Sequence, residues 1–235
     1  MNGKTILITG GSQGLGAELA KKLDEQGVNL IVLALDEEPF RKLNLKNARF
    51  FAVDVSDVEQ AKNFTEKLGG EKIDILISNA GKWTDDEIES RDIGRRRAAI
   101  DANLIGTINI TEALLPLIEE QIVFVISNAA IVGMGGSDGA RWATYNASKW
   151  GARGYVQSLS ARLKLNGGGV KIGAIYPGGF ESNLYESAER SGDAHNQPWM
   201  MATETVANAV LFMLNQPADA NVDELVITKH FGSIK

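Results

Sequence analysis

The most restrictive feature of this sequence is an alternation of short apolar runs with longer amphipathic segments over its 235 residues. The runs are nearly continuous in apolar residues, as strands buried on both faces of a parallel sheet require. This alternation predicts an α/β fold: a doubly wound sheet of seven parallel strands with helices on both faces. The expected strands are Thr5–Thr9, Val28–Ala34, Arg49–Val53, Ile73–Ser78, Ile122–Ser127, Val170–Tyr176 and Glu224–Thr228.

The segments between the strands support the same organisation. Amphipathic stretches predict helices at Leu15–Gln26, Val58–Leu68 and Tyr145–Leu165, the last ending at the helix-terminating sequence NGGG. The sequence contains no linker, low-complexity segment or block of charge. We therefore expect residues 1–235 to form a single domain.

Composition narrows the classes of partner. The formal net charge is −6, which argues against nucleic acid because there is no bulk positive charge to neutralise phosphates. With no cysteine and two histidines, the chain predicts no disulfide and no metal site. No apolar stretch approaches the roughly 18 residues of a membrane span, and the first run is too short for a signal peptide. We expect a cytoplasmic protein that does not contact membranes.

Ligands of a doubly wound sheet bind at the edge formed by the carboxyl ends of the strands. The first expected strand leads into the turn TGGSQGLG, residues 9–16. Gly10, Gly14 and Gly16 allow a sharp turn and a close approach to a ligand, and the N–H groups of the following helix attract phosphate. The same turn also suits a purely structural connection between a strand and a helix, so both interpretations are open.

Small or polar residues follow several other expected strands. Asp54 either faces an adenine edge or belongs to the start of the next helix, which Ser56 or Asp57 would cap. Three further strands lead into the turns SNAG, SNAA and YPGG, at residues 78–81, 127–130 and 176–179. Ser182 follows the last turn closely enough to reach a ligand.

Tyr145 and Lys149 are four residues apart near the beginning of an expected helix, so both side chains lie on one helix face. This spacing is as common on a solvated face as in an active site. If the two act together, the ammonium group lowers the pKa of the phenol from about 10 towards the range of efficient proton transfer.

The motifs TGGSQGLG, DVS, SNAG, Asn103, Tyr145-x-x-x-Lys149 and Pro177–Gly178 resemble, in order and spacing, the short-chain dehydrogenase/reductase family. The resemblance covers essentially the whole chain. It implies a Rossmann-type fold and an NAD(P)-dependent oxidoreductase that interconverts a small carbonyl compound and its alcohol by hydride transfer.

The resemblance also implies residue roles. Tyr145 would be the general acid/base, Lys149 would hold the nicotinamide ribose, and Asn103 would support a water relay to the lysine; otherwise Asn103 is an ordinary residue of a helix surface. The implied cofactor-binding residues are Gly10, Ser12, Gln13, Gly14, Leu15, Gly16, Asp54, Val55, Asn79, Ala80, Gly81, Tyr145, Lys149, Pro177, Gly178 and Ser182.

The sequence departs from the family pattern at the serine that polarises the substrate carbonyl. Asn128 occupies that position, and the stretch from there to Tyr145 is longer than usual. Ser127 could shift into the role, Asn128 could donate an amide N–H, or Ser137 could reach in from the glycine-rich insertion. We expect Ser127. The alternative function is a catalytically impaired dinucleotide-binding sensor or scaffold of the same fold.

Residues after the second expected strand bear on the choice between NAD and NADP. A carboxylate there usually selects NAD and an arginine accommodates the NADP phosphate, but the two positions hold Ala34 and Leu35. The acidic residues 36–38 would repel a 2′-phosphate, whereas Arg41 and Lys42 could fold back towards it. We expect NAD.

The remaining expectations concern substrate and assembly. Residues 179–202 predict a substrate lid over a small apolar pocket, and His195 is interpreted as a lid residue. Trp142 and Trp150 could line that pocket or pack at a subunit interface. Because family members commonly use the helix after Lys149 for subunit contacts, the resemblance implies a homodimer or homotetramer.

Overall fold

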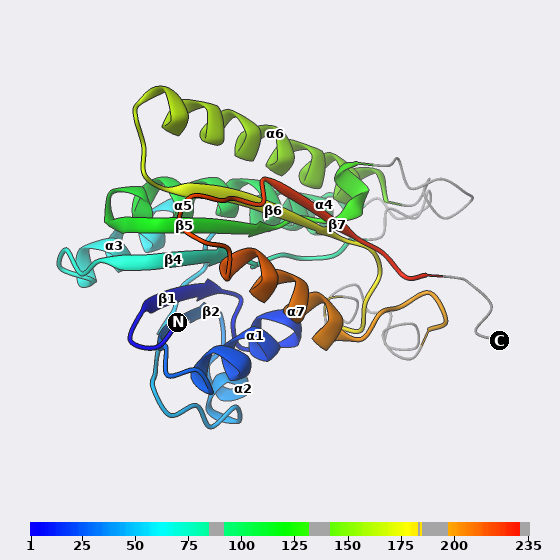
Figure 1. Ribbon diagram of the computed structural model, residues 1–235. Helices are drawn as coiled ribbons and strands as arrows, with labels where there is room; N and C mark the ends of the chain where they lie inside the picture. Colours follow the sequence, from blue (N-terminus) through cyan, green and yellow to red (C-terminus); the bar gives the residue numbers. More distant parts are fainter. Residues whose placement is uncertain (85–91, 132–141, 183, 185–196, 231–235) are drawn as a thin grey trace.

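The computed structural model describes residues 1–84, 92–131, 142–182, 184 and 197–230. Its centre is a seven-stranded parallel sheet in the order β3-β2-β1-β4-β5-β6-β7 (Figure 1). The chain reverses its direction of travel across the sheet between β1 and β4, which is where sheets of this kind bind ligands. The strands are β1 (Thr5–Thr9), β2 (Asn29–Ala34), β3 (Ala48–Ala52), β4 (Ile73–Ser78), β5 (Ile118–Val125), β6 (Lys171–Pro177) and β7 (Glu224–Ile227). The predicted fold class is confirmed.

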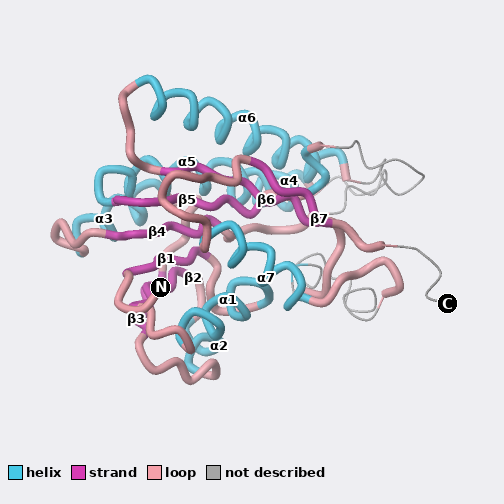
Figure 2. Tube along the Cα trace, in the orientation of Figure 1, coloured by secondary structure: helices cyan, strands magenta, loops and turns pink. Residues whose placement is uncertain are grey.

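Helices cover both faces of the sheet (Figures 1 and 2). One face carries α1 (Gly14–Asp24), the short α2 (Glu37–Arg41) and α7 (Thr203–Leu214). The other carries α3 (Val58–Lys67), α4 (Ile93–Ile100), α5 (Gly106–Leu114) and α6 (Ala143–Leu165). The described residues also form three short helical turns: η1 (Asp101–Ile105), η2 (Leu115–Leu117) and η3 (Asn128–Ala130).

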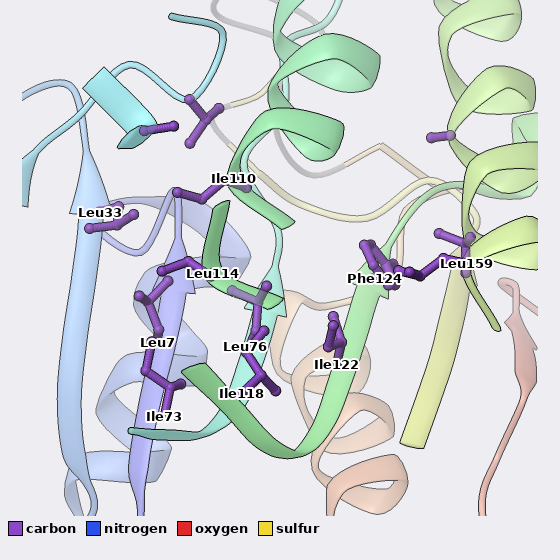
Figure 3. Packing of buried hydrophobic residues seen from close by; sticks show 14 of the residues in the cluster. Leu7, Leu33, Ile73, Leu76, Ile110, Leu114, Ile118, Ile122, Phe124 and Leu159 are labelled. Carbon is purple, nitrogen blue, oxygen red and sulfur yellow. The ribbon is translucent and has the colours of Figure 1, made fainter. Parts of the chain in front are cut away.

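Alternate residues of the strands supply two separate cores. Leu7 packs with Leu76 and Phe124 under α5 and α6 (Figure 3), whereas its neighbours Ile6 and Ile8 pack on the opposite side, under α1 and α7. Successive side chains of a strand point to opposite faces. Both faces are therefore apolar, which explains the nearly continuous apolar runs in the sequence.

The ends of some elements differ from the expected ones. β5 begins at Ile118 rather than Ile122, because the polar pair Glu119–Glu120 lies inside the strand and hides its first residues from an apolar pattern. The helical segment around Asn103 is also irregular: in η1 the N–H of Gly106 bonds to the carbonyl of Asp101, five residues earlier. A single π-helical turn of this kind is frequent at functional sites.

The flanks of the predicted lid lie beside each other. Phe180 and Met201 form a parallel bridge, in which the N–H of Met201 donates to the carbonyl of Gly179 at 2.9 Å. The centre of the predicted lid, including His195, lies outside the described residues, as does Ser137. In the described ranges, no helix combines the length and the apolar character needed to cross a membrane.

Candidate active site

The glycine-rich turn is shaped by steric exclusion. Gly10 and Gly14 have φ angles of +65° and +51°, which favour glycine. A Cβ on Gly16 would lie 2.1 Å from the carbonyl oxygen of Gly10, and one on Gly10 would lie 3.0 Å from the Cα of Ala80. The end of β1 therefore packs directly against the turn after β4, and the N-terminus of α1 opens next to both.

Thr9 and Asn79 lock these two strand ends together. The buried hydroxyl of Thr9 accepts the N–H groups of Asn79 and Ala80, each at 2.9 Å. In return, the amide nitrogen of Asn79 donates to the carbonyls of Thr9 and Gly10 at 3.0 and 3.2 Å. Thr9 is not among the predicted cofactor-binding residues. The sequence feature that could have identified it is a hydroxyl residue at the end of an otherwise apolar strand.

Several predicted cofactor-binding residues could contact a ligand only in part. The side chain of Leu15 belongs to the core under α1, so only its backbone is available. Ser12 is buried, and Gln13 is exposed immediately before α1. Ser182 is buried and its hydroxyl accepts the N–H of Leu184 at 3.1 Å.

The residues after β3 resolve the capping question. Asp57 caps α3 by accepting the N–H groups of Glu59 and Gln60, so the alternative with Ser56 as cap is wrong. Asp54 instead accepts the N–H and the hydroxyl of Ser56, at 2.9 and 2.7 Å.

Val55 is fixed by the helix that follows the π turn. A Cβ on Gly106 would lie 2.6 Å from the Cγ2 atom of Val55, so this close contact requires glycine. The predicted pair Asp54 and Val55 thereby lies against the beginning of α5.

Asn103 is 1% exposed and is therefore not a residue of the helix surface. Its Oδ1 atom accepts the N–H of Lys82 at 2.7 Å, and its Nδ2 atom donates to the carbonyl of Lys82 and the hydroxyl of Ser148, at 2.9 and 3.0 Å. A Cβ on Gly81 would lie 2.9 Å from this Oδ1 and 3.5 Å from the Nζ atom of Lys149. Asn103 thus connects the turn after β4 to α6, next to the lysine amine.

Tyr145 and Lys149 lie together inside the protein, 5% and 6% exposed. The amine of Lys149 is 5.6 Å from the centroid of the Tyr145 ring. Burial lowers the pKa of Lys149 to about 8 and raises the pKa of Tyr145 to about 12. The expected decrease in the pKa of Tyr145 is therefore wrong for this structure, because desolvation of the phenolate has the largest influence.

Ser127 provides the opposing influence on Tyr145. A hydrogen bond with Ser127 lowers the pKa of the phenol, although by less than burial raises it. The same serine hydroxyl accepts the N–H of Ala129 at 3.1 Å, which leaves its proton to be donated to the phenol oxygen. The amide nitrogen of Asn128 lies 3.5 Å from where a Cβ on Gly178 would be.

A cluster of aromatic rings covers Tyr145. The ring of Trp83 lies 4.4 Å from that of Tyr145 and 5.1 Å from that of Trp142, centroid to centroid. Leu184 and Ala129 complete this cluster, which is separate from the two cores beside the sheet. Sequence reasoning considered Trp142 for the pocket but missed Trp83, whose position two residues beyond the SNAG turn was the available signal.

Charged residues around α2 are paired with one another. Asp36 caps this helix by accepting the N–H of Glu38 at 3.0 Å. Arg41 pairs with Glu37 at 3.1 Å and Lys42 pairs with Glu38 at 2.7 Å. The basic residues that could fold back towards a 2′-phosphate are therefore engaged along α2. Over the described part of the chain, no group of three or more metal-ligating side chains could hold a metal ion.

Comparison with known proteins gives consistent similarities. A profile of the short chain dehydrogenase family matches residues 4–192. An uncharacterised oxidoreductase of Staphylococcus epidermidis is 28% identical over 229 residues, which cover 95% of this chain and 96% of that protein. A 3-oxoacyl-(acyl-carrier-protein) reductase of Rickettsia conorii is 30% identical over 230 residues, with 93% and 92% covered.

Solved structures share the fold. An alcohol dehydrogenase from Thermococcus sibiricus, complexed with 5-hydroxy-NADP, has a TM-score of 0.83 at 22% identity and covers 99% of both chains. A 3-ketoacyl-(acyl-carrier-protein) reductase from Brucella melitensis, complexed with NADH, has a TM-score of 0.79 at 23% identity, with 96% of this chain and 97% of that chain covered.

Proposed function

The chain belongs to the short-chain dehydrogenase/reductase family, and from this premise we propose that it is an NAD(P)-dependent oxidoreductase acting on a small carbonyl compound or the corresponding alcohol. The observation that carries the proposal is the arrangement around Tyr145, whose buried phenol has Ser127 at its oxygen and the amine of Lys149 near its ring. Residues 1–235 would form one domain, with the segment 179–202 over the substrate.

The glycine-rich turn suits a dinucleotide. Without a Cβ on Gly16 the chain can turn tightly at this point, and the N–H groups at the start of α1 attract phosphate. Gly10–Gly16, Asn79–Gly81 and Lys149 would hold the cofactor. When bound, it supplies or accepts the hydride.

The protein side chains would move the proton. With a pKa of about 12, Tyr145 is protonated near neutral pH and can donate to a carbonyl oxygen. Ser127 would donate a second hydrogen bond to that oxygen and polarise the carbonyl. Lys149, whose pKa is about 8, carries a positive charge near neutral pH and would stabilise the phenolate that remains.

The decisive experiment replaces the phenol. Tyr145→Phe should decrease turnover by about 100-fold or more, while NADH binding, followed by fluorescence titration, stays nearly unchanged. Tyr155→Phe is the matched control on the same helix, because the Tyr155 hydroxyl bonds at 2.9 Å to Glu112 of α5 and not to a residue of the candidate site. If Tyr145→Phe kept most of its activity on a confirmed substrate, the assigned chemistry would be wrong.

A wide substrate screen separates the two candidate functions. Aldehydes, ketones, hydroxy acids and sugars would be tested with both cofactors. Cofactor binding without turnover of any of them would favour the sensor or scaffold, for which Asn128 at the family's serine position is the motivating observation.

NAD is the proposed cofactor. Ala34 and Leu35 offer no cation for a 2′-phosphate, and Arg41 and Lys42 are paired with glutamates. Titration should give tighter binding of NADH than of NADPH, and Leu35→Arg should improve NADPH binding alone. Tighter binding of NADPH by the unaltered protein would reverse this assignment.

We also propose a homodimer or homotetramer that associates through the outer face of α4, η1 and α6. Large apolar side chains are exposed there: Ile93, Ile100, Ile105 and Trp150. Light scattering after size-exclusion chromatography should give an oligomer mass, and Trp150→Glu should decrease it. A monomer at micromolar concentration would contradict the assembly.

A further inference from the structure

The cluster of Trp83, Trp142 and Tyr145 has a feature that packing alone does not explain. The indole Nε1 atom of Trp142 is buried and has no hydrogen-bond partner among the residues that the structure describes. A buried indole N–H usually finds a partner, because leaving it without one opposes folding. An unsatisfied donor beside Tyr145 suits an acceptor that arrives with a ligand.

The position of the cluster determines what a substrate would contact. Tyr145 is 5% exposed, and the ring of Trp83 lies 4.4 Å from its own ring. A carbonyl compound that reaches Tyr145 therefore approaches a residue whose ring is in contact with Trp83, against which Trp142 packs.

The ring geometry favours one kind of group. Trp83 meets Trp142 at 66° and Tyr145 at 48°, so the cluster presents both ring edges and ring faces. Aromatic rings gain an attraction from such edge and face contacts beyond that of their buried area. A saturated ring of similar size gains only from burial.

We propose that Trp83 and Trp142 determine the substrate specificity of this enzyme, selecting an aromatic carbonyl compound whose ring carries a hydrogen-bond acceptor for the indole of Trp142. The inference rests on the proposed function for the reaction itself. The inference adds to the proposed function the class of substrate and the two residues that recognise the substrate.

The aromatic contact is tested with two aldehydes of similar size. We expect kcat/KM for benzaldehyde to exceed that for cyclohexanecarbaldehyde by about 2- to 12-fold, the range of one aromatic contact. Trp83→Leu should bring this ratio of kcat/KM values close to one. Trp83→Phe retains an aromatic ring and should keep most of the ratio, which distinguishes loss of the aromatic contact from a folding defect. Phe40→Leu, which removes a ring that stacks on Phe50 beside α2, should leave the ratio unchanged.

A ratio near one in the unaltered protein, or a ratio that Trp83→Leu does not change, would overturn the aromatic assignment. The acceptor is tested separately with the three methoxybenzaldehydes against the matching methylbenzaldehydes. At least one methoxy isomer should be preferred by about 2- to 10-fold, as for one hydrogen bond. Trp142→Phe should abolish that preference, and no preference for any isomer would overturn the hydrogen-bond assignment.

Binding measurements test aromatic recognition independently of whether the proposed reaction occurs. If neither aldehyde is turned over, the proposed reaction fails, but binding of benzyl alcohol and cyclohexylmethanol to the NAD⁺-loaded protein can still be compared by calorimetry. Tighter binding of benzyl alcohol that Trp83→Leu removes would support the cluster as an aromatic recognition site. Equal binding of the two alcohols would refute it.

Discussion

The two halves of the candidate site are built in opposite ways. Where β1 meets β4, Thr9 and Asn79 satisfy each other's backbone groups, and the glycines fit because nothing larger does. At the beginning of α6, the buried groups are an amine with a lowered pKa, a phenol with a raised pKa and an indole N–H without a partner.

The two regions differ in what their residues contribute: close packing at the junction of β1 and β4, and reactive polar groups at the beginning of α6. The junction of β1 and β4 stabilises the fold and would present a fixed surface to the proposed cofactor. The α6 half contains groups whose burial opposes folding, and such groups are retained where they serve a reaction or a ligand. Substitutions in the first half should therefore lower stability, and some in the second half should raise it while removing activity.

The largest effect is expected at Gly16. Gly16→Ala places a Cβ against the Gly10 carbonyl, and overpacking of this kind should lower the free energy of unfolding by about 3 kcal/mol or more. NADH binding should be lost as well, because the turn must move. Urea denaturation and a fluorescence titration measure both; unchanged stability and binding would show that the turn is not sterically fixed.

An effect of similar size and opposite sign is expected at Lys149. At pH 7 the amine is charged in both states, and a pKa lowered from 10.5 to about 8 means that folding disfavours this charge by about 3 kcal/mol. Lys149→Met should therefore raise the free energy of unfolding at pH 7 by about that amount and abolish turnover.

The same linkage gives a pH signature. Above pH 8 the folded protein loses this proton before the unfolded chain does, so the stability of the unaltered protein should rise with pH up to about 10.5. The advantage of Lys149→Met should shrink over that interval. Urea denaturation at pH 7 and pH 9.5 tests this, and an advantage that is absent at pH 7 would contradict the burial argument.

A moderate loss of stability is expected at Thr9. Thr9→Val preserves shape but leaves the N–H groups of Asn79 and Ala80 without their acceptor, which should lower the free energy of unfolding by about 1 to 3 kcal/mol. Thr65→Val is the control, because that hydroxyl only donates to the carbonyl of Ala61 within α3. Equal effects of the two substitutions would remove the special role of the strand junction.

The smallest effect concerns Gly154, on the same helix as Tyr145 and Lys149. Nothing in the described part of one chain lies within 4 Å of a Cβ at this position, so in the monomer Gly154→Ala should raise the free energy of unfolding by about 0.5 to 1 kcal/mol through helix propensity alone. Turnover should be unchanged. A decrease in the stability of the monomer would contradict the helix-propensity argument. A decrease confined to the oligomer would indicate that the proposed assembly covers Gly154, which lies one turn from Trp150 on α6.

Local patterns predicted much of this molecule. The seven strands follow from apolar runs, because a strand that is buried on both faces has apolar residues at consecutive positions. Tyr145, Lys149 and Asn103 were selected from spacing and resemblance, and they lie together in the structure. The sequence does not distinguish Ser56 from Asp57 as the cap of α3, since both types of residue suit the position and only the backbone geometry separates them.

The sequence by itself determined the fold class, the glycine-rich turn and the candidate pair Tyr145 and Lys149, because these depend on residue type and on distances along the chain. Only the tertiary structure decided the pKa directions of Tyr145 and Lys149, the hydrogen bond between Ser127 and the phenol, and the contact with Trp83. Those properties depend on how deeply a group is buried and on which distant segments surround it. Burial and long-range contact are set by the packing of the whole sheet and its helices, and no short stretch of sequence contains them.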